Sequence, residues 1–281
     1  MVGHTASLDR RHQDFISTIL RWTGLSLVAT VWISAVIFGA YILAFYGGAI
    51  SANHMEDWNR RLPDLYDAKM PSAVLSMGAH LITGTALLLL GPVQLFGSLR
   101  CRWPAVHRWI GRVYVASAVS AGLGGLIFVL LKGTIGGMWM SIGFGLSGAL
   151  TILSALLTFY YARVRKFELH RAWGIRLFAL VIGSWLYRIE YGLWLGLFGG
   201  GHTHTFDGSV DLIMDFFFYL PNLVLAEIHI RSETLHGGAV LRGVGSTILA
   251  LACALIVVST YFFTVQQWGG PIMNMLFGQR G

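Results

Sequence analysis

The segment MPSAVLSMGAHLITGTALLLLGPVQLFGSL, residues 70–99, contains no Asp, Glu, Lys or Arg. A run of about 20 apolar residues is long enough to cross the hydrocarbon core of a bilayer as a helix. Four other uncharged runs of similar or greater length occur at residues 22–55, 113–131, 133–162 and 243–279. Charged residues make up 12% of the chain, whereas roughly a quarter is usual in soluble domains. The sequence therefore predicts an all-α integral membrane protein with several spans.

Two further segments, residues 172–198 and 211–230, have the required length but carry embedded charges. With them the sequence predicts seven transmembrane helices, at residues 22–46, 73–97, 109–131, 139–162, 172–198, 211–230 and 244–267. Short loops on the cytoplasmic side of a membrane are enriched in Lys and Arg. Most basic residues of this chain, including those within 100–112 and 163–176, fall on the side of the N-terminus. We therefore expect a cytoplasmic N-terminus and, after seven crossings, a C-terminus outside.

This topology divides the chain into three parts. We expect a cytoplasmic segment at 1–21, one membrane domain at 22–268 with an outer loop at 47–71, and an outer tail at 269–281. The first apolar stretch is too long for a cleavable signal peptide, so it is expected to remain as a helix. The formal charge of +7 resides in the inner loops and not on one solvated face, which excludes nucleic acid as a partner. The first expected partner is the lipid bilayer.

An internal repeat relates the second to the fifth predicted helices. An offset of 63 residues aligns His107-Arg108 with His170-Arg171, and Gly111 with Gly174. Each unit is a helix that enters from outside, a basic inner loop, and a His-Arg pair at the start of the returning helix. Helices two to five are thus predicted to form a duplicated hairpin. Ligand sites in membrane proteins often lie between such repeats.

Several motifs in these helices carry a family resemblance. They are GPVQ at 91–94, LRCRWPAVHRWIGRVY at 99–114, HRAWGIR at 170–176, and Pro221-Asn222-Leu223 followed by Glu227. Together they resemble bacterial predicted membrane proteins of the domain-of-unknown-function family 2306. The similarity covers helices two to six, and it departs from the family pattern at Gly174, where a bulkier residue such as Met is expected. The resemblance implies a multi-pass protein of the bacterial inner membrane and carries no assigned activity.

One candidate site lies at the predicted inner face. His107-Arg108 and His170-Arg171 begin the third and fifth predicted helices, and helix N-termini favour anions. We expect a lipid headgroup or another anionic ligand there. The members of this candidate site are His107, Arg108, His170, Arg171, Arg176, Asn222 and Glu227. Glu227 would be the counter-charge of Arg171 or Arg176, and Pro221 would kink the sixth helix. The alternative is that these residues are topology anchors with a structural ion pair.

A second candidate site lies within the membrane. It comprises His80, Arg188, Glu190 and Asp215. Ionisable groups at such depth are expensive and mark functional sites by default. Residues two apart in a helix do not face each other. We therefore pair Arg188 with Asp215, and Glu190 with His80 or Tyr219, either around a ligand cavity or as a structural network between helices two, five and six.

Cofactor sites are weaker alternatives, and no cofactor is predicted. A b-type haem needs two imidazoles at one depth; His107 and His170 share a depth but lie at the surface, and His80 has no second histidine at its level. Thioether and imidazole ligands suit copper. The copper candidates are His202, His204, Met138, Met140, Met273 and Met275.

We expect a membrane-embedded binding or transport-type protein, acting alone or as an accessory subunit of a larger membrane complex. Two alternatives stay open: a haem- or copper-binding membrane redox protein, and a purely structural subunit. The sequence has no Ser-His-Asp, His-Glu-x-x-His or paired cytosolic carboxylate arrangement, so no catalytic residue is predicted and an enzyme is disfavoured.

Overall fold

The computed structural model describes residues 2–232 and 239–278, and within these ranges the secondary structure is entirely helical. The α-helices are α1 (Val2–Ile42), α2 (Gly48–Ser51), α3 (Pro71–Leu95), α4 (Gly97–Arg102), α5 (Pro104–Lys132), α6 (Gly137–Arg163), α7 (Phe167–Val181), α8 (Gly183–Leu197), α9 (Ser209–Phe217), α10 (Leu220–Ser232), α11 (Ala239–Phe263) and α12 (Gly269–Phe277). Six helical segments are long and apolar enough to cross a membrane, and the bent pair α7–α8 makes a seventh. The prediction of an all-α polytopic membrane protein is confirmed.

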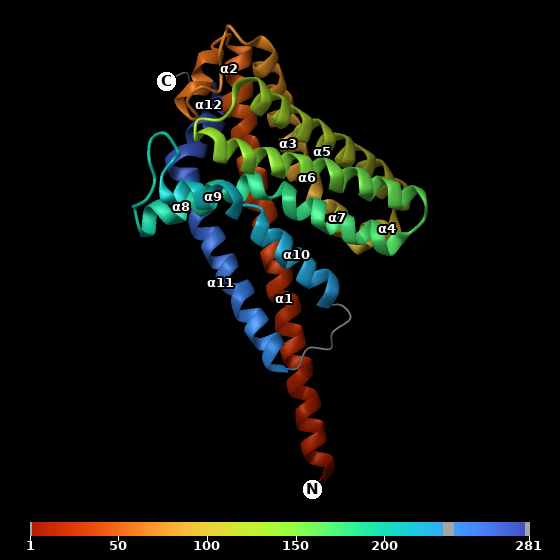
Figure 1. The fold of residues 1–281 in the computed structure, drawn as a ribbon. Helices are drawn as coiled ribbons and strands as arrows, with labels where there is room; N and C mark the ends of the chain where they lie inside the picture. Colours follow the sequence, from red (N-terminus) through yellow and green to blue (C-terminus); the bar gives the residue numbers. More distant parts are fainter. Residues whose placement is uncertain (1, 233–238, 279–281) are drawn as a thin grey trace.

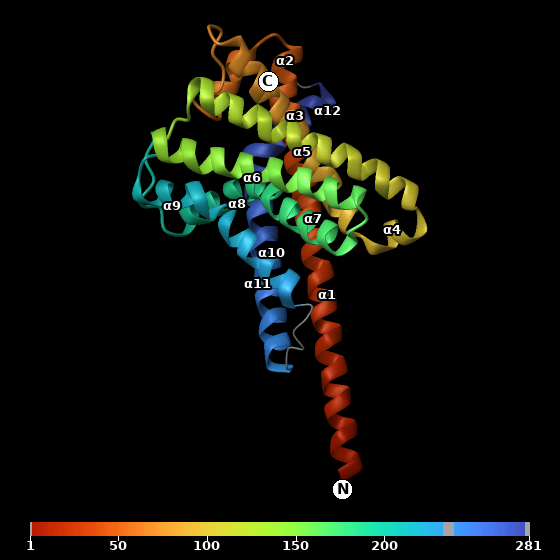
Figure 2. The ribbon, with the colours of Figure 1, turned by 45° about the vertical axis from the view of Figure 1, so that its right-hand side comes forward.

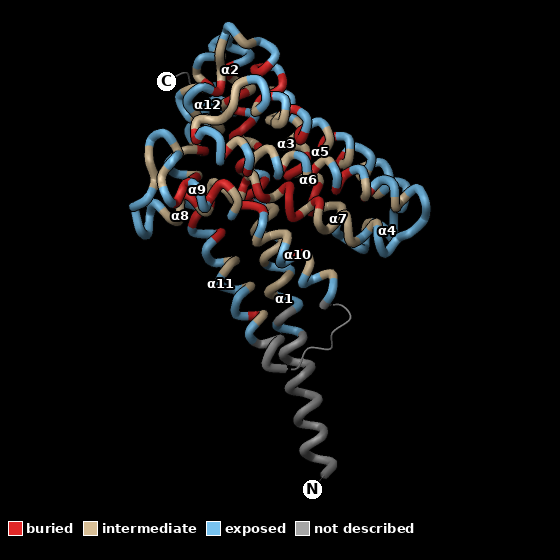
Figure 3. The backbone as a smooth tube through the Cα atoms, viewed as in Figure 1, coloured by how far each residue is buried: buried red, intermediate tan, exposed pale blue. Residues whose placement is uncertain are grey.

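Two groups of helices cross each other. Figure 1 shows α3, α5, α6 and α7 running side by side, with the long helices α1 and α11 inclined across them. The view in Figure 2 agrees, and α1 packs along α11 and against α3. In Figure 3 the buried backbone is concentrated where the two groups cross. The ends of the spans are largely exposed, as expected for apolar helices that face lipid.

Both long helices contain a π-helical turn near their ends. One turn covers Leu43–Gly47 after α1, and the other covers Thr264–Trp268 between α11 and α12. The chain therefore continues as the helix α12 within the segment 269–281, where a tail was expected. Residues 279–281 and Met1 lie outside the described ranges. The Trp268 ring stacks against Phe263 at a centroid separation of 5.2 Å, and Phe38 of α1 lies 5.3 Å away. These rings fill the space between the two turns.

The loop at 47–71 closes one end of this crossing. It contains the short helix α2 and a 3-10 helix over Met55–Arg60. Trp58 is 1% exposed, and its Nε1 donates a hydrogen bond of 3.1 Å to the carbonyl of Tyr46. Asn59 exchanges two hydrogen bonds with the backbone of Tyr66, at 2.9 and 2.8 Å. The loop is thus anchored by one buried indole and one paired amide.

The fifth and sixth predicted helices are each broken, and the two breaks touch. Helix five bends by 42° between α7 and α8. A Cβ atom at Gly183 would lie 2.8 Å from the carbonyl oxygen of Phe218, so this close approach requires glycine. Phe218 lies at the break between α9 and α10, three residues before Pro221. The sequence predicted an interruption of the sixth helix at this proline. Asn222 Nδ2 donates 2.7 Å to the Phe218 carbonyl and so satisfies it at the break.

A buried hydroxyl joins three spans. Ser34 of α1 is 1% exposed, and its Oγ accepts hydrogen bonds from Trp185 Nε1 of α8 at 3.0 Å and from Thr260 Oγ1 of α11 at 2.6 Å. Buried polar groups in membranes must be satisfied within the protein. This junction therefore fixes the bent span to the two long helices.

Candidate functional site

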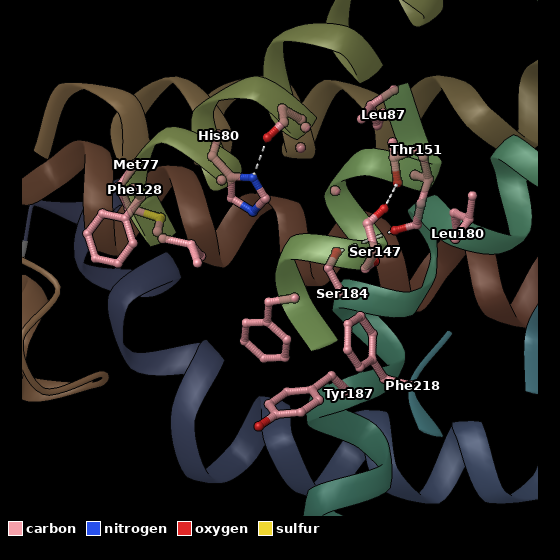
Figure 4. Close-up of a pocket in the computed structure, with 18 of the residues that line it drawn as sticks. Met77, His80, Leu87, Phe128, Ser147, Thr151, Leu180, Ser184, Tyr187 and Phe218 are labelled. Atoms are coloured by element: carbon pink, nitrogen blue, oxygen red, sulfur yellow. Dashed lines mark hydrogen bonds between the residues drawn. The ribbon is translucent and has the colours of Figure 1, made fainter. Parts of the chain in front are cut away.

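A cavity of about 210 Å³ lies where α3, α5 and α6 meet the bend between α7 and α8 (Figure 4). Most of its wall is apolar, including Met77, Phe128, Phe144 and Phe218. The polar side chains of the wall are His80, Thr134, Ser147, Thr151, Ser184, Tyr187 and Arg188. Ligand sites have this composition, with an apolar wall and a few placed polar groups.

His80 presents a hydrogen-bond acceptor to the cavity. Its Nδ1 lies 2.8 Å from the carbonyl oxygen of Ala121 in α5. A carbonyl oxygen only accepts, so Nδ1 must carry the proton and Nε2 retains its lone pair. Figure 4 shows the ring within the cavity. α5 can approach α3 this closely because Gly124 and Gly125 have no side chain. A Cβ atom at Gly124 would lie 2.5 Å from the Ser76 carbonyl oxygen, and one at Gly125 would lie 3.2 Å from His80 Nδ1.

Arg188 lines the same cavity without a carboxylate partner. Its Nη1 donates 2.9 Å to the carbonyl of Ser184, and its guanidinium lies 4.9 Å from the centre of the Phe38 ring. Within the described residues, no Asp or Glu lies within ion-pair distance of it. The expected pair with Asp215 is wrong. Successive residues of a helix point about 100° apart, so Tyr187 faces α9 and Asp215 while Arg188 faces α1.

Glu190 and Asp215 lie outside the cavity. Asp215 is 0% exposed, and both its carboxylate oxygens lack a hydrogen-bond partner among the described residues, as does Glu190 Oε2. The expected pairing of Glu190 with His80 or Tyr219 is also wrong, because His80 bonds Ala121 and the Tyr219 hydroxyl is unpartnered in this part of the chain. The four predicted intramembrane residues thus divide into two in the cavity and two elsewhere.

The ion pair predicted for Glu227 is present with Arg176. Glu227 Oε2 accepts from Arg176 Nε at 3.0 Å and from Nη2 at 2.6 Å, and Oε1 accepts from Arg231 Nε at 2.9 Å. The Arg176 guanidinium also lies 4.8 Å from the centre of the Trp173 ring. Because Glu227 belongs to α10 and Arg176 to α7, the network connects the two broken spans.

The predicted inner His-Arg pairs are brought near each other but are bonded differently. His170 Nδ1 lies 2.9 Å from the Thr158 carbonyl oxygen of α6. His107 Nδ1 is buried with no partner among the described residues, and His107 is close enough to His170 for an electrostatic interaction. Arg108 and Arg171 are exposed. Asn222 bonds the backbone at the α9–α10 break and is not part of this group.

The family motif around α3 and α5 is a packing motif. A Cβ at Gly111 would lie 3.3 Å from Gln94 Oε1, and Gln94 Nε2 donates 3.4 Å to the His107 carbonyl. A Cβ at Gly91 would lie 3.2 Å from the Tyr114 hydroxyl. The two glycines let the amide and the phenol lie between the helices, which explains why these residue types occur together.

The proposed copper ligands are dispersed or otherwise engaged. Asp211 Oδ1 accepts from His202 Nδ1 at 2.7 Å and from the Tyr191 hydroxyl at 2.5 Å. His204 is exposed, Met140 is 4% exposed, and Met138, Met273 and Met275 lie at the surface. No group of three His, Cys, Asp or Glu side chains with metal-site spacing exists in the described ranges. These residues do not fit a copper centre.

The loop at 199–208 is ordered by two aspartates. Asp211 Oδ2 accepts from the backbone N–H groups of Thr203 at 3.0 Å and Gly208 at 2.9 Å. Hydrogen bonds from the hydroxyls of Thr203 and Thr205 hold the pKa of Asp207 below its ordinary value. The signal for this network in the sequence is the pattern Thr203-x-Thr205-x-Asp207 before a helix start, which suggests local capping.

These features define a multi-pass, all-α membrane protein with a cavity between its helices. Residues 77–230, more than half of the chain, match the family described as "Predicted membrane protein (DUF2306)". The chain belongs to this family, and the resemblance seen in its loop motifs is confirmed. No curated protein and no solved structure matches the chain.

Proposed function

We propose that this protein binds a small, largely apolar molecule carrying one anionic group in the cavity between α3, α5, α6 and α8. The observation that carries this proposal is Arg188, a residue of the cavity wall whose guanidinium has no carboxylate partner in the described residues. Arg188 is half-buried, and a charge within the membrane that has no counter-ion is costly. The Phe38 ring and the neighbouring Tyr46 hydroxyl compensate this charge only in part. A bound anion would supply the missing charge.

The remaining wall indicates what else the molecule contains. His80 Nε2 can accept a hydrogen bond, so a hydroxyl on the ligand would be recognised there. Phe128, Phe144 and Phe218 favour an aromatic ring. A volume of about 210 Å³ suits a single ring with its substituents. A hydroxylated aromatic acid has all three properties.

Binding of 4-hydroxybenzoate to the purified full chain in detergent, measured by calorimetry, tests this proposal. We expect Arg188→Gln to weaken binding by roughly tenfold or more, since a hydrogen bond to a charged group is worth about 1.5–3 kcal/mol. Arg188→Lys should retain part of the affinity. Arg163→Gln, an exposed residue at the end of α6, is the control and should bind as the wild type does.

Two results would refute the assignment. One is the absence of binding to the wild type, and the other is equal binding to Arg188→Gln and the wild type. Neutral benzyl alcohol separates the contribution of the ring from that of the charge. The predicted lipid headgroup site at His107 and His170 has weaker support, because His170 Nδ1 is already bonded to Thr158.

A further inference from the structure

Asp215 is a buried acid with nothing to stabilise its charged form. Its side chain is 0% exposed, and neither Oδ1 nor Oδ2 has a hydrogen-bond partner among the described residues. It lies one turn beyond Asp211 in α9. Burial of a lone carboxylate is expensive, and a proton on it removes that cost. Such a group marks a proton-binding position in membrane proteins.

Few of the helices that pack around Asp215 carry an ionisable group near it. α9 packs against α6, α8 and α10. From α6 the contact is Gly143, where a Cβ would lie 3.3 Å from Asp215 Cβ, and α6 has no titratable side chain at this level. From α8 the neighbour is Tyr187, which is close enough to Asp215 for an electrostatic interaction. On α9 itself it is Asp211.

Asp211 connects this interior to the loop at 199–208. Its Oδ1 accepts from His202 Nδ1 at 2.7 Å and from the Tyr191 hydroxyl at 2.5 Å. The His202 side chain is 22% exposed, whereas that of Asp211 is 0% exposed. One carboxylate oxygen therefore lies between a solvent-accessible imidazole and a buried phenol.

Tyr191 in turn contacts Tyr187, one helical turn earlier in α8. Their ring centroids are 4.7 Å apart, and the buried Tyr187 hydroxyl has no hydrogen-bond partner in the described part of the chain. Tyr187 lines the cavity, on the side away from His80 in Figure 4. The titratable groups thus form a series from the loop to the edge of the cavity, in which hydrogen bonds join His202, Asp211 and Tyr191 and a ring contact continues to Tyr187.

We propose that His202, Asp211, Tyr191 and Tyr187 form a proton-transfer path, with Asp215 as the buried acid that holds the proton. A proton from water binds His202 Nε2, and the Nδ1 proton passes to Asp211. Asp211 protonates the Tyr191 oxygen, the Tyr191 proton passes to Tyr187, and the Tyr187 proton forms the O–H bond of Asp215. One proton is taken up, each intermediate group ends with the proton count it began with, and no electron is transferred. Before the transfer, the Tyr191 hydroxyl must turn from Asp211 to Tyr187, and the Tyr187 hydroxyl must move into hydrogen-bond distance of Tyr191 and Asp215, since it has no partner among the described residues. After the transfer, His202 must return its proton from Nε2 to Nδ1 by exchange with water.

Infrared spectroscopy of the full chain in lipid vesicles tests this path. The carbonyl band of a protonated acid shifts when the O–H group becomes O–D, so transfer from H2O to D2O reports the exchange rate. We expect a carbonyl band that Asp215→Asn removes and Glu190→Gln retains. If Asp215→Asn does not fold, the band displacement produced by Asp215→Glu gives the same assignment.

The path itself is tested by variants that keep the packing. Tyr187→Phe retains the ring and lacks the hydroxyl, and we expect it to slow exchange of the Asp215 band by roughly a hundredfold, as for loss of a positioned proton donor. His202→Gln should also slow exchange, whereas the matched loop variant His204→Gln should exchange at the wild-type rate. Equal rates in Tyr187→Phe and the wild type, or the absence of an Asp215 band, would overturn the proposal. No cavity ligand is present in this experiment, so its outcome is independent of the proposed binding role.

Discussion

Glu227 holds Arg176 through two hydrogen bonds to one carboxylate oxygen, at 3.0 and 2.6 Å, and so ties α10 to α7. Charge-assisted bonds of this kind are among the stronger contacts between helices. α7 and α10 each adjoin a break in their span, at Gly183 and at Phe218. The position of the bent region therefore depends on this pair.

We expect Glu227→Gln to lower the midpoint of thermal unfolding, because it leaves Arg176 without its counter-charge. Arg231→Gln should have a smaller effect, since Arg231 is 76% exposed and its pair is screened by solvent. Thermal unfolding of the purified protein at low and high salt measures both. Glu168→Gln, an exposed acid at the start of α7, is the control, and an equal change there would contradict the assignment.

Arg188 and Asp215 should behave as independent positions. They face different helices and share no contact, so the effects of Arg188→Gln and Asp215→Asn on the free energy of unfolding should add to within about 0.5 kcal/mol. A double-mutant cycle by chemical unfolding in mixed micelles provides the measurement. A larger coupling energy would show that Arg188 and Asp215 interact, as was predicted from the sequence.

Gly143→Ala should destabilise the fold by about 1–3 kcal/mol, the range for overpacking of a buried contact. The new Cβ would lie 2.3 Å from the Asp215 carbonyl oxygen, which belongs to a helix backbone and cannot move freely. Gly145→Ala is a matched control two residues away, where the nearest atom, in the Leu126 side chain, is 3.8 Å from the added Cβ. Equal stability of the two variants would show that α6 and α9 pack less closely than described.

Ser34→Ala should cost about 1–3 kcal/mol, because it leaves the Trp185 indole N–H and the Thr260 hydroxyl buried without an acceptor. The exposed Ser51, whose Oγ bonds the Gly48 carbonyl, provides the control as Ser51→Ala. The free energy of unfolding of both variants can be compared in the same micelles. A Ser34→Ala protein as stable as Ser51→Ala would exclude the three-helix junction.

The loop at 199–208 should loosen in acid. The threonine hydroxyls hold the pKa of folded Asp207 below its ordinary value of 3.8. The stabilisation is therefore fully present above that ordinary value and is lost as the pH falls through the lower folded-state value. Amide hydrogen exchange of the loop at pH 6 and pH 3, corrected for intrinsic rates, measures this change. Asp207→Asn should remove most of it, and Asp64→Asn, in the other loop, should not.

The spans could be predicted from the sequence because lipid imposes a length on apolar runs. The helix predicted at 139–162 is α6 (Gly137–Arg163), and the one predicted at 73–97 is α3 (Pro71–Leu95). The break at Phe218 was also predictable, since Pro221 cannot donate a backbone hydrogen bond. The break before Gly183 was not, because its cause is the close approach of the distant Phe218 carbonyl.

The depth of the candidate site in the membrane could be predicted from the sequence, but the direction in which each of its side chains points could not. The positions of His80 and Arg188 along their helices placed both within the membrane, and both line the cavity. Partners depend on the rotation of each helix about its axis, which the bend in α7–α8 changes. The pairing of Arg188 with Asp215 failed for that reason. The adjacent glycines at 124 and 125 are a signal in the sequence for the close approach of α5 to His80.

The junction at Ser34 has a consequence for biosynthesis. Ser34 belongs to α1, Trp185 to α8 and Thr260 to α11, so the three partners are synthesised in that order. Chains are made from the N-terminus, and earlier parts can fold before later parts exist. The family core at 77–230 is therefore complete in a nascent chain that still lacks the Thr260 bond. Insertion of α11 is the event that completes the junction, and a chain that ends before α11 lacks the bond from Thr260 to Ser34.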